Sequence, residues 1–144
     1  MESRVSIITL GVADLGRAVR FYRDGLGFPT GYKDGEGIAF FQTNGVRLAL
    51  YPRKALAEDI GTGVEPGEPG FGGITLAHNV RTREEVAQVL ALAEAAGAVI
   101  VKPAQDSFWG GHHGYFRDLD GYYWEIVWGP MFSFDANGAL VIGG

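Results

Sequence analysis

The pattern of apolar and polar positions at the start of the chain predicts a strand followed by a helix. Residues 5–12 are rich in β-branched side chains and partly alternate, which is typical of a strand. Asp14 is a residue type favoured at a helix N-cap, where its side chain accepts a backbone N–H. From Leu15 the apolar side chains follow a helical period, and Gly25 or Gly27 is expected to end the helix.

A hairpin and a linker are predicted next. Residues 38–42 and 46–51 flank the dipeptide Asn44-Gly45, which is a strong turn signal between two strands. Residues 54–60 predict a short helix. The following stretch is rich in glycine and proline and is interpreted as a linker.

The same order of patterns recurs in the second half of the chain. A strand, a helix, a short strand and a hairpin are predicted at residues 74–80, 83–96, 99–101 and 114–128. Thr82 and Glu85 have the spacing of a capping box, which marks the start of the helix. The two halves share almost no sequence identity, so the repeat is one of architecture.

Composition narrows the function classes. With 144 residues, 47% of them apolar and 20% charged, the chain has the make-up of one globular domain. The absence of cysteine excludes disulfides, thiolate metal sites and a cysteine nucleophile. A net charge of −5 without a basic stripe argues against a nucleic-acid partner, and no apolar run is long enough for a membrane span. We therefore expect a cytoplasmic protein that binds small molecules.

Specific residues in both halves resemble one family. In order along the chain they are Gly11–Leu15, Phe21-Tyr22, Leu26-Gly27, Tyr115–Asp118, Asp120-Gly121 and Trp124-Glu125. Together they resemble the two module signatures of the vicinal oxygen chelate superfamily. This superfamily includes glyoxalase I, the bleomycin-resistance proteins, the fosfomycin-resistance enzymes and the extradiol dioxygenases. The resemblance covers about residues 5–130 and speaks for the fold more than for one activity, because this fold hosts unrelated chemistries.

The resemblance implies an α+β fold in which two βαβββ modules form half-barrels around a cavity. It also implies a glyoxalase-like domain and a C-terminal segment, with expected bounds of 1–130 for the domain, 5–60 for module one, 61–72 for the linker, 73–128 for module two and 129–144 for the segment. Within that segment, Asn137-Gly138 predicts a hairpin. Phe132 and its apolar neighbours predict packing on the end of the barrel or on a partner subunit.

Active members of the family hold a divalent metal with four residues, typically His and Glu. By resemblance these positions fall on Ile7, Leu48, Gly73 and Glu125, of which only Glu125 can bind a metal. His78 lies five residues beyond Gly73 and on the opposite face of its strand, so we expect a structural histidine there. A catalytic metal needs about three protein ligands. We therefore expect no metal cofactor, although a rebuilt site with His113, Glu125 and water stays open.

Glu125 is the candidate catalytic residue. A carboxylate on the inner face of a half-barrel can accept hydrogen bonds from a ligand, and burial would raise its pKa toward that of a general base. The alternative is a structural carboxylate tied to a tyrosine or an arginine. Tyr115 lies ten residues earlier and is expected across the hairpin on the same face, where a tyrosine lines the active site of the extradiol dioxygenases.

Aromatic and apolar residues complete the predicted ligand site. His112 and His113 are adjacent and must point to opposite sides, so one is expected to line the pocket and the other to face solvent. Trp109 lies among glycines and is expected to cover a pocket or to pack at an interface. The full set of predicted ligand-binding residues is Thr9, Phe40, Leu48, Thr75, Trp109, His113, Tyr115, Tyr123 and Glu125.

Three functions remain open at this point. The first is a homodimeric, metal-independent protein that binds a small aromatic or amphiphilic molecule, as bleomycin-resistance proteins do. The second is an enzyme of lyase, isomerase or dioxygenase type that uses Glu125 as a base or a divergent metal site. The third is an interaction protein with a filled cavity. The identity of a ligand depends on side-chain packing that one sequence does not determine.

Overall fold

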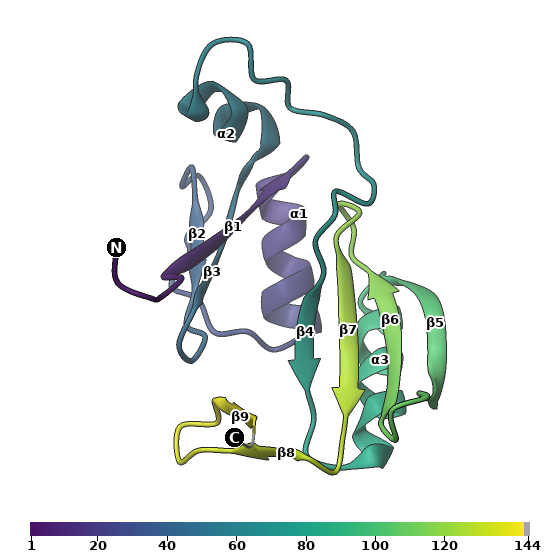
Figure 1. The fold of residues 1–144 in the computed structure, drawn as a ribbon. Helices are drawn as coiled ribbons and strands as arrows, with labels where there is room; N and C mark the ends of the chain where they lie inside the picture. Colours follow the sequence, from purple (N-terminus) through teal and green to yellow (C-terminus); the bar gives the residue numbers. More distant parts are fainter. Residues whose placement is uncertain (143–144) are drawn as a thin grey trace. The chain divides into compact units, whose positions relative to one another are not determined.

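The computed structural model describes residues 1–142 as two compact units, 1–68 and 69–142 (Figure 1). No helix in the described part of the chain is long and apolar enough to cross a membrane. The last two residues of the predicted C-terminal segment, 143–144, lie outside the described residues.

The first unit is a three-stranded sheet with two helices. Its elements are β1 (Ile7–Val12), α1 (Leu15–Arg20), the π-helical turn η1 (Phe21–Gly25), β2 (Ala39–Phe41), β3 (Arg47–Pro52) and α2 (Arg53–Ile60). The Asp14 side chain accepts the Arg17 N–H at 2.8 Å and caps α1, as the sequence predicts. The strand order is β1-β3-β2, with β1 parallel to β3. Thr30 extends this sheet by a single bridge to Phe41.

The core of the first unit lies on one face of its sheet. Phe41, Leu48 and Leu50 are buried there, together with Val19 and Tyr22 from the helical segment. The rings of Tyr22 and Phe41 lie 5.8 Å apart, within the range of favourable aromatic contacts.

Leu48 was predicted to line the ligand site together with Thr9 and Phe40. It does not share a face of the sheet with them, so its assignment to that site is wrong. Thr9 and Phe40 both pair with Ala49, whereas Leu48 pairs with Ile8 and Phe41. Successive side chains on a strand point to opposite sides. Because the hairpin pairs Phe41 with Leu48, even-numbered positions on β2 face the same side as odd-numbered positions on β3. Leu48 therefore belongs to the core.

The second unit repeats the plan with a complete set of strands. Its elements are β4 (Leu76–Asn79), α3 (Arg83–Ala95), β5 (Val99–Asp106), β6 (His112–Arg117), β7 (Tyr123–Trp128), β8 (Phe132–Phe134) and β9 (Leu140–Ile142). The strand order is β4-β7-β6-β5, so the first strand again pairs in parallel with the last strand of the module. The capping box of Thr82 and Glu85 is present at the start of α3.

Helix α3 covers one face of the four-stranded sheet. Val86, Leu90 and Ala93 form its buried stripe. Gly114 on β6 lets this helix approach closely, because a Cβ at that position would lie 2.6 Å from Leu90 Cδ1. The opposite face of the sheet carries the candidate site. Neither sheet closes into a barrel within residues 1–142.

The C-terminal segment forms a hairpin of β8 and β9. Gly138 takes a positive φ of 82° in its turn, where the Asp135 side chain accepts the N–H groups of Asn137 and Ala139. Phe132 contacts the ring of Trp109 at 6.0 Å, and the Arg81 guanidinium lies 4.5 Å from the centre of the Phe134 ring. Phe132 and Phe134 therefore pack within the second unit, whereas Met131 and the apolar residues of β9 are exposed.

Candidate functional site

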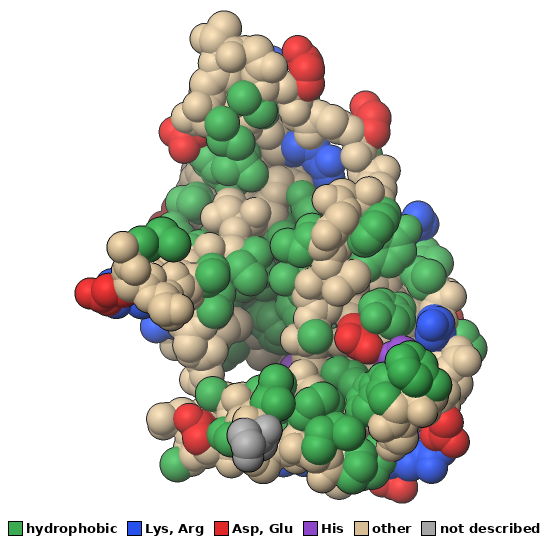
Figure 2. All heavy atoms as spheres, in the orientation of Figure 1, with side chains coloured by type: hydrophobic (Ala, Val, Ile, Leu, Met, Phe, Trp, Pro, Cys, Tyr) green, Lys and Arg blue, Asp and Glu red, His purple; other side chains and the backbone are tan. Residues whose placement is uncertain are grey.

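The uncovered face of the four-stranded sheet gathers three of the predicted site residues. Tyr115 on β6 pairs directly with Glu125 on β7, as their ten-residue spacing predicts, and His113 pairs with Val127. Because side chains alternate along each strand, His113, Tyr115 and Glu125 point to the same side, away from α3. Figure 2 shows an acidic and a histidine side chain among apolar side chains over this sheet.

His113 and Glu125 are in direct contact. His113 Nδ1 lies 2.8 Å from Glu125 Oε1, and the two side chains are only 14% and 22% exposed. A carboxylate only accepts at neutral pH, so the Nδ1 atom of His113 carries the proton of this bond. A neutral imidazole then has an unprotonated Nε2 that can accept a further proton or hydrogen bond.

Tyr115 completes the cluster. Burial raises the pKa of its hydroxyl, and the negative charge and the hydrogen bond of Glu125 raise it further. The phenol is therefore neutral at physiological pH and donates to the carboxylate. The ring of Tyr115 lies 5.7 Å from that of His113, and Lys102 Nζ lies 5.6 Å from its centre. Lys102 places a positive charge within cation–π distance.

Other predicted residues of the second unit lie beside this cluster. Tyr123 is two positions before Glu125 on β7 and shares its face, where Phe71 packs edge-on against it at 6.0 Å. Thr75 directly precedes β4, and Ala77 pairs with Glu125, so strand alternation places Thr75 on the same face. This sheet face thus combines polar groups with aromatic rings.

Comparison with known proteins agrees with this architecture. The model of the family "Glyoxalase/Bleomycin resistance protein/Dioxygenase superfamily" matches residues 4–126. The chain belongs to this superfamily. A glyoxalase-related enzyme from Fulvimarina pelagi is 37% identical, with a TM-score of 0.89 and 99% of each chain covered. No curated protein matches significantly.

Two further superfamily structures are similar. A glyoxalase/bleomycin resistance protein/dioxygenase from Nocardioides is 25% identical, with a TM-score of 0.74, 89% of this chain covered and 84% of that one. Lactoylglutathione lyase from Agrobacterium tumefaciens is 22% identical, with a TM-score of 0.68, 94% of this chain covered and all of that chain (100%). At this identity the likeness to the lyase shows the fold alone.

The residues of this chain do not fit the four-ligand metal site that the resemblance implies. Ile7, Leu48 and Gly73 carry no metal-binding side-chain atom, and Leu48 also points into the core. Opposite Ile7 on β3 stands Arg47, a cation. His113 and Glu125 supply two donors, and residues 1–142 hold no cluster of three or more potential metal-binding side chains.

Trp109 packs within its own unit. The Cβ that an alanine at Gly111 would carry would meet the Trp109 ring at 2.0 Å, and one at Gly129 would meet it at 2.9 Å. The ring also contacts Phe132 of the C-terminal hairpin. The two neighbouring glycines therefore give this large ring room to pack against that hairpin.

His112 is not the solvent-facing partner that the sequence predicts. Its Nδ1 lies 2.8 Å from Asp106 Oδ1, on the face covered by α3, and its side chain is 14% exposed. Asp106 also accepts a hydrogen bond from Arg83 at 2.6 Å. The hydrogen bond from His112 is the largest cause that lowers the pKa of Asp106. His78 points to the same side of the sheet, and desolvation lowers its pKa.

The sequence analysis did not identify Lys102 as a site residue, nor the polar residues Gln42 and Arg47 that lie near Phe40 on the first unit. A short strand was predicted at residues 99–101, whereas β5 continues to Asp106; because β5 is an edge strand, it tolerates Pro103. The pairing of Lys102 with Tyr115 follows from this longer strand.

Thr9 and Phe40, two other predicted site residues, lie on the first unit, where Phe40 is 49% exposed.

Proposed function

We propose that this protein binds a small aromatic or amphiphilic organic molecule on the four-stranded sheet, without the metal of its active relatives. The observation that carries the proposal is the His113–Glu125–Tyr115 cluster on a face not covered by α3. Its polar atoms are held in place by one another, and Tyr123 supplies an aromatic surface beside them. Ligand sites commonly join a few oriented polar groups to an apolar wall.

The charge of the cluster indicates the polar group that the ligand carries. Glu125 and the unprotonated Nε2 of His113 are acceptors, so a hydroxyl or amine donor on the ligand fits them. The aromatic rings favour an unsaturated or ring-containing body through stacking. A homodimer is part of this proposal, as for the bleomycin-resistance proteins that the sequence resembles.

Ligand-observed NMR with small aromatic amines and phenols tests the proposal. We expect binding by the unmodified protein and a loss of at least about tenfold in affinity for Glu125→Gln, because a charged acceptor is replaced by a neutral one. Glu84→Gln changes the same group on the exposed side of α3 and is expected to leave affinity unchanged. Equal affinities for all three proteins would refute the site.

A second function, proton-transfer catalysis, is favoured by the orientation of His113. Glu125 holds Nδ1–H of the imidazole, which leaves Nε2 to take a proton from a carbon acid or a hydroxyl group of the substrate. The resemblance to a glyoxalase-related enzyme at 37% identity supports this alternative. Exchange of the C–H hydrogens of hydroxyacetone in heavy water, lost in His113→Gln, would favour catalysis; binding without exchange would favour sequestration.

A further inference from the structure

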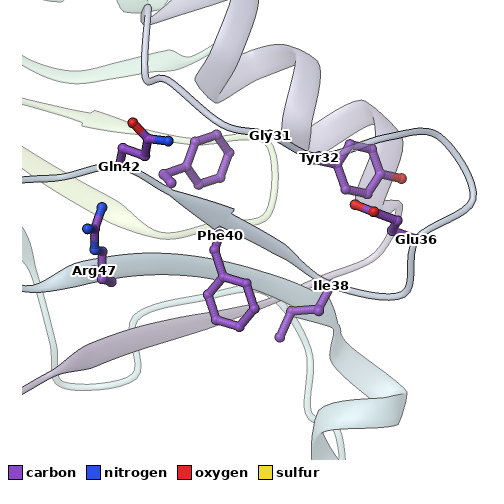
Figure 3. Close-up of a pocket in the computed structure, with 8 residues that line it drawn as sticks. Gly31, Tyr32, Glu36, Ile38, Phe40, Gln42 and Arg47 are labelled. Carbon is purple, nitrogen blue, oxygen red and sulfur yellow. The ribbon is translucent and has the colours of Figure 1, made fainter.

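A cavity on the first unit carries a second set of polar groups that the proposed function does not use. It has a volume of about 470 Å³ and is open to solvent, and its lining includes Tyr32, Glu36, Ile38, Phe40, Gln42 and Arg47. Figure 3 shows Arg47 and Gln42 at one end, Tyr32 and Glu36 at the other, and Ile38 and Phe40 between them. Every lining residue belongs to the same unit and to the segment 31–47.

The wall of this cavity is held in place by hydrogen bonds. Thr30 Oγ1 donates to the Phe40 carbonyl at 2.6 Å and accepts the Tyr32 N–H at 3.2 Å. The Gln42 N–H donates to the Pro29 carbonyl at 2.8 Å. Residues 29–32 are therefore tied along β2, and the cavity exists before any ligand enters, which lowers the cost of ordering on binding.

Phe40 gives the cavity an apolar surface that the fold leaves uncovered. Its neighbours Ala39 and Phe41 are 1% and 0% exposed, whereas Phe40 is 49% exposed. A half-exposed aromatic ring in a pocket offers a face on which an apolar or aromatic ligand body can pack.

Arg47 gives the cavity a positive charge that no carboxylate neutralises. Its side chain takes part in no ion pair within residues 1–142. A guanidinium presents paired N–H donors that match the two oxygens of a carboxylate, and the Gln42 amide beside it can donate as well. At the opposite end, Glu36 uses Oε2 to accept the Lys33 N–H, which leaves its other oxygen for a donor.

We propose that this cavity binds an organic carboxylate with an apolar middle and a hydroxyl or amine at its far end. The carboxylate pairs with Arg47 and Gln42, the middle packs on Phe40 and Ile38, and the far group donates to Glu36. This site uses residues of the first unit alone and does not depend on the His113–Glu125 pair.

Amide-resolved NMR titration with para-hydroxyphenylpropionate tests the proposal on the full chain. We expect shifts concentrated in residues 31–47 and a dissociation constant of about 1 mM or tighter. The primary amide of the same compound lacks the negative charge and is expected to bind at least about tenfold more weakly. Phenylpropionate lacks the far hydroxyl and is expected to bind more weakly as well.

Two variants place the ligand in the cavity. Arg47→Gln should weaken binding of para-hydroxyphenylpropionate at least about tenfold, whereas Arg20→Gln removes the same charge from α1 and should leave it unchanged. Gly31→Leu should block the cavity, because a Cβ at Gly31 meets no atom within 4 Å and its backbone is not left-handed. Gly72→Leu is the matched control, since Gly72 is equally open and lies outside the first unit.

The outcomes separate this site from the one on the second unit. Equal binding of the acid and its amide, or unchanged binding in Arg47→Gln, overturns the carboxylate site. The absence of any binding also overturns the carboxylate site. Shifts that map to residues 113–125 and vanish in Glu125→Gln overturn it as well, but they would agree with the proposed function. Shifts at residues 31–47 that persist in Glu125→Gln support binding in the cavity of the first unit. They do not test binding on the four-stranded sheet.

Discussion

The contact between His113 and Glu125 changes the role that each residue can play. A free Glu125 would be the general base that its place in the superfamily motif suggests. With one oxygen accepting from His113 and a further bond from Tyr115, the carboxylate instead orients the imidazole. In a neutral imidazole, Nε2 of His113 is then the nitrogen that can take a proton from a ligand. The base of any proton-transfer chemistry therefore moves from the carboxylate to the histidine.

The titration of Tyr115 reports on this cluster. Burial raises the pKa of its hydroxyl most, followed by the charge and the hydrogen bond of Glu125. Because the pKa is higher in the folded state, the neutral phenol stabilises the fold below its ordinary pKa of about 10, and this contribution is lost as pH rises through the folded value. In Glu125→Gln the pKa of Tyr115 should fall, but it should stay above the ordinary value because burial still raises it.

NMR of ring-labelled tyrosine measures this titration directly. Glu84→Gln serves as the control, because Glu84 is not among the groups that shift the pKa of Tyr115. An unchanged titration of Tyr115 in Glu125→Gln would contradict the hydrogen bond between the two side chains.

Residue-level predictions from the sequence succeeded where local rules decide the geometry. The Asp14 cap and the shared face of Tyr115 and Glu125 follow from residue type and strand parity. Leu48 was assigned to the wrong face of the sheet. The face of a residue on β3 depends on the register in which β3 pairs with β2, and a turn motif alone does not determine that register. The His113–Glu125 bond could not be predicted, since it depends on side-chain rotamers that strand parity does not determine.

At the scale of elements, the approach of α3 to its sheet depends on Gly114. A Cβ there would lie 2.6 Å from Leu90 Cδ1 and 2.7 Å from the Lys102 carbonyl oxygen. Gly114→Ala should therefore lower the free energy of unfolding by about 1–3 kcal/mol through overpacking. Gly72→Ala, where the added Cβ meets open space, should change it little. Urea unfolding of both variants checks this; equal stabilities would show that the helix shifts without cost.

The start of α3 predicts a pH dependence. The N–H groups of Thr82 and Arg81 donate to the Glu85 carboxylate and hold its pKa below the usual value. A lowered pKa in the folded state means that the charged form stabilises the fold above the usual Glu pKa of about 4.3, and that this contribution is lost as pH falls through the lowered value.

Glu85→Gln isolates this contribution. The variant should be less stable than the unmodified protein at about pH 7, and the difference should shrink toward about pH 3. Thermal unfolding across this range measures the difference, with Glu84→Gln on the same helical turn as the control. A difference that stays constant with pH would contradict the role of the carboxylate in the capping box.

At the scale of the whole molecule, the two units share one strand plan. In each, the first strand pairs in parallel with the last strand of the module, which pairs antiparallel with the strand before it. The repeat of patterns along the sequence predicted this plan, because the order of strand, helix and hairpin is visible in the apolar periodicity. The residue pattern of the first half also predicts only three strands, and the fourth strand that the βαβββ resemblance implies is reduced to a single bridge at Thr30.

The assembly of the protein remains a prediction. We expect a homodimer, and light scattering coupled to size exclusion should give twice the mass of 15.5 kDa for one chain. A single-chain mass at concentrations of about 100 µM or more, far above a dissociation constant of about 1 µM, would contradict the dimer. Adding the amine and phenol probes during the same measurement shows whether ligand binding and assembly are linked.

The stretch between α2 and β4 offers a practical consequence. Residues 62–67 are all exposed and belong to no helix or strand, whereas Phe71, a few residues later, already packs on Tyr123. Exposed backbone outside helices and strands is where chains accept insertions and where proteases cut first. A fluorophore or affinity tag inserted at 62–67 would leave both sheets intact, and a single protease cut there would fall between the two sheets without cutting a helix or a strand.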